Sequence, residues 1–183
     1  MGIDENHNTR VQGEGDRIAA LCESIRRAFP SDTYTRRVTP YDDELSSELR
    51  EDQLILDEDQ DLFRALKGRK WTEVSKRFIE SLPDALPLLT DEAFVAFLPA
   101  WLVCSLENID GENEVRDFVV YNFSPRSEMV PDTTWFTKNR LQLLNPEQRR
   151  IVRSLLMEFT ERGTSPPVKA LAAKGVSLID TLA

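Results

Sequence analysis

The stretch that most constrains the fold runs from Thr90 to Asn108, with the sequence TDEAFVAFLPAWLVCSLEN. Between Ala93 and Leu106 it has no charged side chain, and its large apolar residues fall on every side of a helical wheel. A helix that is apolar all round is buried in a core or spans a membrane. This stretch contains Pro99 and is shorter than the roughly 20 residues that a span requires. We therefore expect a central core helix that other helices surround.

The remaining segments show the apolar spacing of three and four residues that is typical of amphipathic helices. Glycine is scarce, with only 7 in the chain, which also favours helix. Besides the central stretch, the spacing predicts helices over residues 16–29, 41–53, 58–67, 71–82, 146–162 and 166–174. It also predicts a helix over residues 114–123, although the VVY there would by itself fit a strand, and a brief segment of unassigned type follows around residues 135–144. The predicted fold is all-α, a single-domain bundle of helices around the central apolar helix.

Helix boundaries are clearest where capping residues stand. Asn145 is a predicted N-cap, with Pro146 at the first helical position and Gln148 at the third. Gly175 is expected to break the last helix. Pro99 lacks an N–H and would clash with the preceding turn, so it either kinks the central helix or splits it in two.

The sequence also predicts how the chain is divided. Residues 1–14 have little to bury and are expected to form a disordered tail, followed by a helical domain over 15–163 and a short helical extension over 164–183. The N-terminus lacks the charged and then apolar layout of a signal peptide, so we expect a cytoplasmic protein. Cys22 and Cys104 are expected to be buried free thiols.

The acidic segment, residues 42–61, is the most unusual part of the chain in composition. It contains ten acidic residues against the single base Arg50, and it therefore carries the whole net charge of −9. The acidic residues are Asp42, Asp43, Glu44, Glu48, Glu51, Asp52, Asp57, Glu58, Asp59 and Asp61. This run is either a solubilising face or a docking surface for a basic partner, since concentrated charge steers association.

Other residues carry weaker signals for binding. Trp135 follows a polar loop and is a candidate anchor in a protein interface, although core tryptophan is the simpler interpretation. The arginines at 149, 150 and 153 would form a basic strip, but acidic residues on the same helix favour an ordinary solvated face. The net charge argues against direct binding of nucleic acid or of an anionic membrane.

Three sequence patterns occur in order along the chain. They are F-x-x-x-x-G-x-x-W around Phe63, Gly68 and Trp71; L-T-x-E-A-F-x-x-F-L-P-A-W-L over residues 89–102; and L-N-P-E-Q over residues 144–148. Together they resemble a family of small bacterial proteins that is classed only as a domain of unknown function. The resemblance covers about residues 20–161. It implies a soluble, α-helical bacterial protein, and it supplies no reaction and no catalytic residue.

Patterns for catalysis are weak. Asp57, Asp59 and Asp61 spell D-x-D-x-D, but Leu62 and Gly68 stand where a calcium loop needs glycine and glutamate. Glu48 and Asp52 share a predicted helix face, yet their many acidic neighbours suggest an exposed surface that is poor for tuning a pKa. The only histidine, His7, lies in the predicted tail, which argues against histidine chemistry. The sequence therefore predicts no catalytic residue, metal ligand or cofactor.

The leading functional expectation is a non-enzymatic protein-binding module. It would act as an immunity or inhibitor-type protein that docks a basic partner, such as a toxin or a nucleic-acid-binding protein, through the acidic segment. Two alternatives stay open at this point. One is a small enzyme that uses carboxylates or a carboxylate-bound divalent metal, and the other is a structural subunit of a larger bacterial complex.

Overall fold

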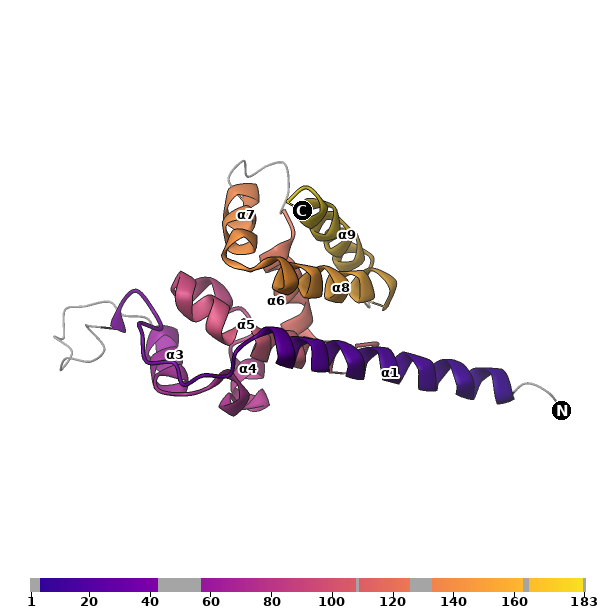
Figure 1. Cartoon of the computed structure of the whole chain (residues 1–183), viewed down its shortest axis with the longest axis horizontal. Helices are drawn as coiled ribbons and strands as arrows, with labels where there is room; N and C mark the ends of the chain where they lie inside the picture. The colour runs from indigo at the N-terminus through magenta and orange to yellow at the C-terminus, as the bar shows by residue number, and fades with distance from the viewer. Residues whose placement is uncertain (1–3, 43–56, 108, 126–132, 163–164, 183) are drawn as a thin grey trace.

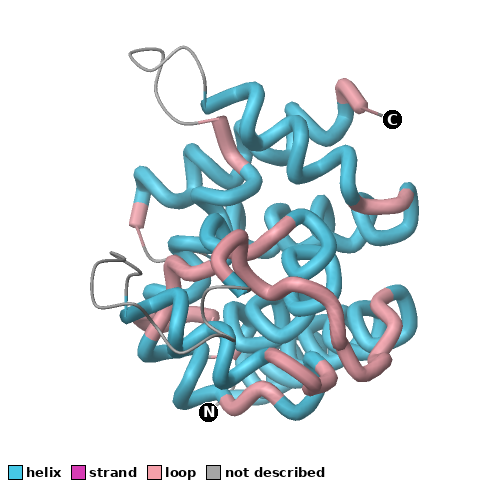
Figure 2. The backbone as a smooth tube through the Cα atoms, turned by 90° about the vertical axis from the view of Figure 1, so that its left-hand side faces the viewer, coloured by secondary structure: helices cyan, strands magenta, loops and turns pink. Residues whose placement is uncertain are grey.

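The computed structural model describes residues 4–42, 57–107, 109–125, 133–162 and 165–182. In these ranges the chain is helical and has no strand, which confirms the predicted all-α class (Figures 1 and 2). The elements are α1 (Asp4–Ala28), α3 (Asp57–Leu66), η1 (Trp71–Glu73), α4 (Lys76–Ser81), η2 (Leu86–Leu88), α5 (Asp91–Leu106), α6 (Glu114–Phe123), α7 (Thr133–Leu143), α8 (Pro146–Arg162) and α9 (Pro166–Asp180).

Helix α5 lies at the centre of the molecule, as the sequence predicts. Phe94, Phe97, Leu98 and Trp101 on α5 are fully buried, and helices α1, α4, α6 and α7 all contact it. The helix continues from Asp91 to Leu106 without a break at its internal proline, so that residue does not split it. An all-round apolar surface is thus matched by partners on all sides.

Helices α6, α8 and α9 pack together in the C-terminal half (Figure 1). Val168, Ala172 and Ile179 of α9 are buried in the same apolar core as α5, so α9 packs against this core. The predicted break at Gly175 is wrong, because α9 runs through it to Asp180. Gly175 is needed for close packing: a Cβ atom there would lie 2.8 Å from the carbonyl oxygen of Phe123 and 2.9 Å from Leu156 Cδ1.

Helix α1 is longer than the sequence suggests. We predicted a helix over residues 16–29 after a disordered tail, whereas the helical backbone begins at Asp4 and extends beyond the rest of the molecule (Figure 1). Tertiary contacts lie toward the other end, where Ile25 and Phe29 are buried. Once one end of a helix is held by packing, adding further turns needs no new nucleation. The spacing of apolar residues gives no sign of such an extension, because the sequence there has few apolar residues.

The segment predicted as one amphipathic helix over residues 71–82 is instead two elements. A 3₁₀ turn, η1, places Trp71 in the core, and α4 then begins after Ser75. The Ser75 hydroxyl accepts a hydrogen bond from the backbone N–H of Phe78 at 3.3 Å. A serine in this position competes with helix continuation and favours a new N-cap, which is why the segment divides.

The N-terminus of α8 forms as predicted. Asn145 Oδ1 accepts from Gln148 N at 2.9 Å, and Gln148 Oε1 accepts from Asn145 N at 3.0 Å, which is a reciprocal capping box. Gln148 Nε2 also donates to Ala28 O at 3.1 Å, so this residue joins the end of α1 to the start of α8. In the part of the chain that the structure describes, no helix is both long and apolar enough for a bilayer crossing.

Candidate functional site

The acidic segment begins at a buried carboxylate. Asp42 is 2% exposed and accepts hydrogen bonds from Val38 N at 2.9 Å and Thr39 N at 2.7 Å. Lys67 Nζ, just after α3, lies 2.9 Å from Asp42 Oδ2. We call Val38, Thr39, Asp42 and Lys67 the Asp42 clamp. It joins the start of the acidic segment to the chain just after α3, the helix in which the segment ends.

The clamp favours the charged form of Asp42. Burial alone opposes ionisation, but the backbone N–H groups of Thr39 and Val38 and the ammonium of Lys67 outweigh it, and the pKa of Asp42 is lowered. This carboxylate is therefore charged near neutral pH while it is shielded from solvent. It holds the local structure and has neither the raised pKa nor the access that a general acid would need.

The clamp is connected to the central helix. Val38 O accepts from Thr90 N at 3.0 Å, and Thr90 Oγ1 donates to Arg37 O at 2.7 Å. Thr90 is also the N-cap of α5, where it accepts from Ala93 N. On the other side, Gly68 has a φ of +72° and its N–H donates to Tyr34 O at 2.8 Å. The base of the acidic segment is thus hydrogen-bonded both to the start of the central helix and to the chain after α3.

The structure changes the interpretation of two predicted site residues. Asp42 and Asp59 were expected on an exposed acidic face, but they are buried, with exposures of 2% and 3%. Asp61 is exposed and lies 3.8 Å from Arg64 on the next turn of α3. Helix α3 buries Leu62 and Leu66, and Asp59 lies on the same face of the helix, so it is buried with them.

The other predicted residues are not placed in space. Asp43, Glu44, Glu48, Glu51 and Asp52 lie outside the described residues, as does the predicted helix over residues 41–53 beyond Asp42. Asp57 and Glu58 belong to the first turn of α3 and Trp135 belongs to α7, but their side chains also lie outside the described part. For α3 itself, the predicted span of residues 58–67 and the stop at Gly68 are confirmed.

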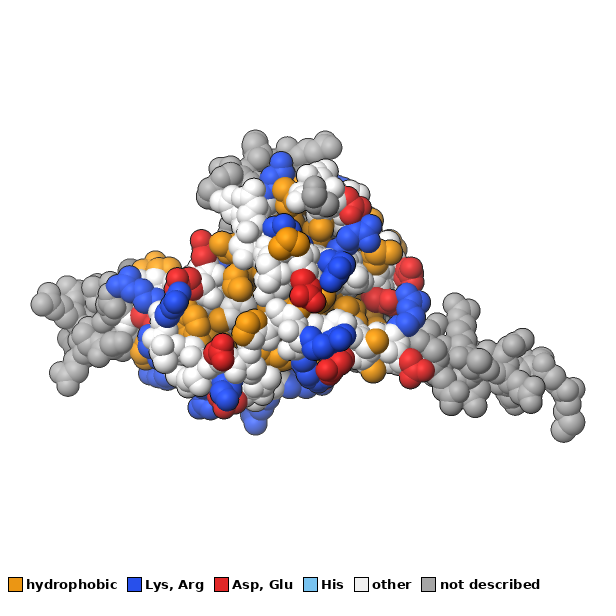
Figure 3. All heavy atoms as spheres, viewed as in Figure 1, with side chains coloured by type: hydrophobic (Ala, Val, Ile, Leu, Met, Phe, Trp, Pro, Cys, Tyr) orange, Lys and Arg blue, Asp and Glu red, His pale blue; other side chains and the backbone are white. Residues whose placement is uncertain are grey.

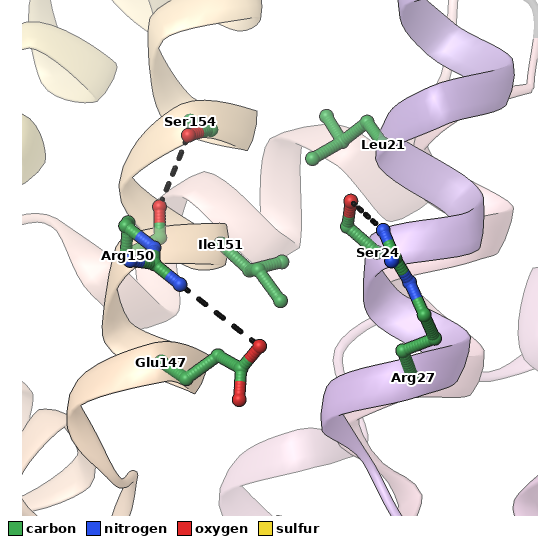
Figure 4. A pocket seen from close by; sticks show the side chains of 7 residues that line it. All are labelled: Leu21, Ser24, Arg27, Glu147, Arg150, Ile151 and Ser154. Carbon is green, nitrogen blue, oxygen red and sulfur yellow. Dashed lines mark hydrogen bonds and ion pairs between the residues drawn. The ribbon is translucent and has the colours of Figure 1, made fainter.

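A cleft that the sequence did not predict lies between α1 and α8 (Figure 4). Its volume is about 380 Å³. Both helices contribute an apolar residue, a serine and an arginine, and α8 adds a glutamate: Leu21, Ser24 and Arg27 from α1, and Glu147, Arg150, Ile151 and Ser154 from α8. The only sequence signal was the set of arginines in α8, which we had interpreted as a solvated face.

The three arginines of that predicted strip have separate environments in the structure. Arg149 donates to Leu144 O at 2.9 Å, and Arg153 forms a bidentate pair with Asp180 at 2.6 and 3.2 Å. Arg150 alone lines the cleft. On the face that Figure 3 shows, the described surface mixes basic, acidic and apolar side chains. The strip is therefore not one continuous basic surface.

The corner between α5 and α6 contains the one buried thiol in the described core. Cys104 lies beside Lys76 and Glu107, which form an ion pair, and two adjoining hollows of about 230 and 280 Å³ contact these three residues. Burial, and then the charge of Glu107, raise the pKa of the Cys104 thiol to about 11. It is a neutral thiol near neutral pH and a poor nucleophile. Cys22 is also a free thiol, and burial raises its pKa.

Among the described side chains, no group of three or more histidine, cysteine, aspartate or glutamate residues is positioned to hold a metal ion.

Structural hydrogen bonds join α5 to α6 at this corner. Asn113 caps α6 by accepting from Arg116 N at 3.0 Å, and its amide nitrogen donates to Glu107 O at 2.7 Å. Arg116, which is fully buried, donates to the carbonyls of Ile109 and Gly111.

The fold and these sites describe an all-helical protein with a single apolar core. The chain belongs to a family of unknown function, DUF6714, which matches residues 18–169. No curated protein and no solved structure matches the chain. The matched range extends from within α1 to the start of α9.

Proposed function

We propose that this protein is a non-enzymatic protein-binding module that docks a basic partner through its acidic segment, in the manner of an immunity or inhibitor-type protein. The observation that carries the proposal is the distribution of charge: residues 42–61 hold ten acidic residues and one basic residue, and the rest of the chain is balanced. Such a concentration of one sign raises the rate of association with an oppositely charged surface.

The Asp42 clamp supports this function because it anchors the acidic segment at both ends. Asp42 precedes the segment's remaining acidic residues and Lys67 follows α3, and their ion pair joins positions 25 residues apart in the chain. A segment with fixed ends loses less conformational entropy when it binds than a free tail does. A basic partner would therefore meet carboxylates in a segment that the clamp fixes at both ends.

The burial of Asp42 and Asp59 divides the predicted residues into two roles. These two would support the segment from within, and a partner would contact the remaining acids: Asp43, Glu44, Glu48, Glu51, Asp52, Asp57, Glu58 and Asp61. Trp135, from α7, stays a proposed anchor. A toxin or a nucleic-acid-binding protein has the basic groove that such carboxylates would occupy.

The test compares two triple variants that remove the same charge. One variant neutralises the acidic segment (Asp43→Asn, Glu44→Gln, Glu48→Gln), and the other neutralises exposed acids elsewhere (Asp32→Asn, Asp84→Asn, Glu112→Gln). Tagged proteins would capture partners from a lysate of the native host, washed at low and high salt, and each captured protein would then be purified and its affinity measured.

We expect a basic partner that binds wild type and the control variant and is lost from the acidic-segment variant. The affinity of the partner should fall as salt increases, because dissolved ions weaken the attraction between exposed charges. At 0.1 M salt this attraction is largely lost beyond about 10 Å. Equal binding of that purified partner by both triple variants would contradict the proposal, as would affinity that does not change with salt.

A further inference from the structure

We propose that the cleft between α1 and α8 binds a small organic anion, whose carboxylate or phosphate group lies between Arg27 and Arg150 and whose apolar part covers Leu21 and Ile151. This site is separate from the acidic segment, and its ligand has the opposite charge preference. The inference stands on the cleft itself and on the side chains that line it (Figure 4).

The charge of the cleft is positive. Arg27 and Arg150 come from its two walls, and Glu147 is the one acidic residue that lines it. Glu147 lies 3.9 Å from Arg150, at the outer limit of an ion pair between exposed side chains, and such pairs contribute little. Arg27 has no carboxylate partner among the described side chains, and its guanidinium reaches Ser24 Oγ only at 3.5 Å. Both guanidinium groups therefore retain donors for a ligand.

Arginine is the residue that best fits such a ligand. Its planar guanidinium offers several N–H donors in a fork that matches two oxygens of a carboxylate or phosphate. The two serines are already committed: Ser24 donates to Ala20 O at 2.9 Å and Ser154 donates to Arg150 O at 3.1 Å. The arginines are thus the main hydrogen-bond donors for the anion. The serine oxygens can still accept a hydrogen bond from a polar substituent of the ligand.

The shape of the cleft selects an anion with an apolar part. Its volume of about 380 Å³ lies within the range of small-molecule sites, roughly 300–1,000 Å³. Leu21 is half-buried and keeps apolar surface open to the cleft, and Ile151, which is only 6% exposed, adds a small part to this apolar floor. A bare inorganic ion would leave this floor uncovered, whereas an aromatic or short aliphatic group would bury it.

The test titrates the full chain at low salt with phenyl phosphate, and calorimetry measures the affinity. Inorganic phosphate and phenol, each of which retains one half of the probe, form the matched comparisons. Benzoate replaces the phosphate by a carboxylate and distinguishes the two anion classes. The variants are Arg27→Gln and Arg150→Gln in the cleft, Glu147→Gln beside it, and Arg77→Gln on the exposed surface of α4 as a control of equal charge change.

We expect saturable binding of phenyl phosphate or benzoate, with inorganic phosphate and phenol each weaker by about tenfold or more, which corresponds to one lost set of contacts. Arg27→Gln and Arg150→Gln should each weaken binding by about tenfold, and Glu147→Gln should tighten it several-fold by removing the competing carboxylate. A gain in affinity cannot come from a damaged fold. No saturation with either probe, or an equal loss in Arg77→Gln, would overturn the proposal.

Discussion

The apolar centre around α5 and the Asp42 clamp stabilise the same fold by different physical means. In the centre, Phe97 and Trp101 of α5 are fully buried and are placed by volume, as is Gly175 where α9 meets α6. At the clamp, a buried carboxylate is placed by hydrogen bonds and by Lys67. The first region should respond to any change in size and be indifferent to pH. The second should respond to the loss of a charge and to acid.

The largest effect is expected in the apolar centre. Trp101→Ala removes a fully buried side chain and leaves a cavity, so the free energy of unfolding should fall by about 3–5 kcal/mol. Chemical denaturation measures this loss. The loss should be the same at pH 7 and pH 5, and a strong pH dependence would contradict the picture of a purely steric centre.

The next effect is expected at the clamp. Asp42→Asn puts an amide N–H₂ where the carboxylate accepts from Val38, Thr39 and Lys67, and one donor must lose its acceptor. We expect a loss of about 2–3 kcal/mol, as for buried hydrogen bonds to a charged group. Asp61→Asn is the matched control, because it is the same substitution at an exposed position of α3. It should alter the free energy of unfolding by less than about 0.5 kcal/mol. Similar losses in both variants would show that Asp42 has no special role.

A smaller effect, at the contact between α9 and α6, tests packing without a cavity. Gly175→Ala should lower the free energy of unfolding by about 1–2 kcal/mol, because the added Cβ meets the backbone oxygen of Phe123. Gly15→Ala in α1 has nothing within 4 Å and should instead raise stability by about 0.5–1 kcal/mol through helix propensity. If both alanines stabilise the protein, α9 is not held as closely against α6 as the structure has it.

The smallest effect near neutral pH separates the two regions by titration. Because the pKa of Asp42 is lowered in the folded protein, its contribution is fully present above the unfolded value of about 4 and is lost as the pH falls through the folded value. Wild type should therefore lose more stability than Asp42→Asn between pH 5 and pH 3. Denaturation curves at several pH values would measure this difference, and parallel profiles would contradict it.

Much of the fold followed from local signals in the sequence. The all-round apolar stretch predicted the buried α5, and Asn145, Pro146 and Gln148 predicted the start of α8. Gly68, with its positive φ, marked the end of α3. These features are readable because capping, left-handed backbone and apolar spacing act within one helix or one turn.

The site depended on contacts that no local pattern contains. A run of ten acids predicted an exposed surface, but Asp42 and Asp59 are buried because each lies on the inner side of a segment whose neighbours form the core. The α1–α8 cleft joins Arg27 to Arg150 across 123 positions of sequence. Their spatial meeting depends on how α1 and α8 pack, which the spacing within either helix does not specify.

The sequence by itself determined the class of fold, the central helix and the concentration of charge, because composition and short-range periodicity encode these directly. The tertiary structure decided that Gly175 continues a helix, that Asp42 is a buried anchor and that two arginines face one cleft. Each of these depends on a neighbour distant in sequence: Phe123 for Gly175, Lys67 for Asp42 and α8 for Arg27. Packing assigns such roles because one residue type can serve in more than one. A glycine can end a helix or allow two helices to approach closely, and an aspartate can be solvated or buried, according to what lies against it.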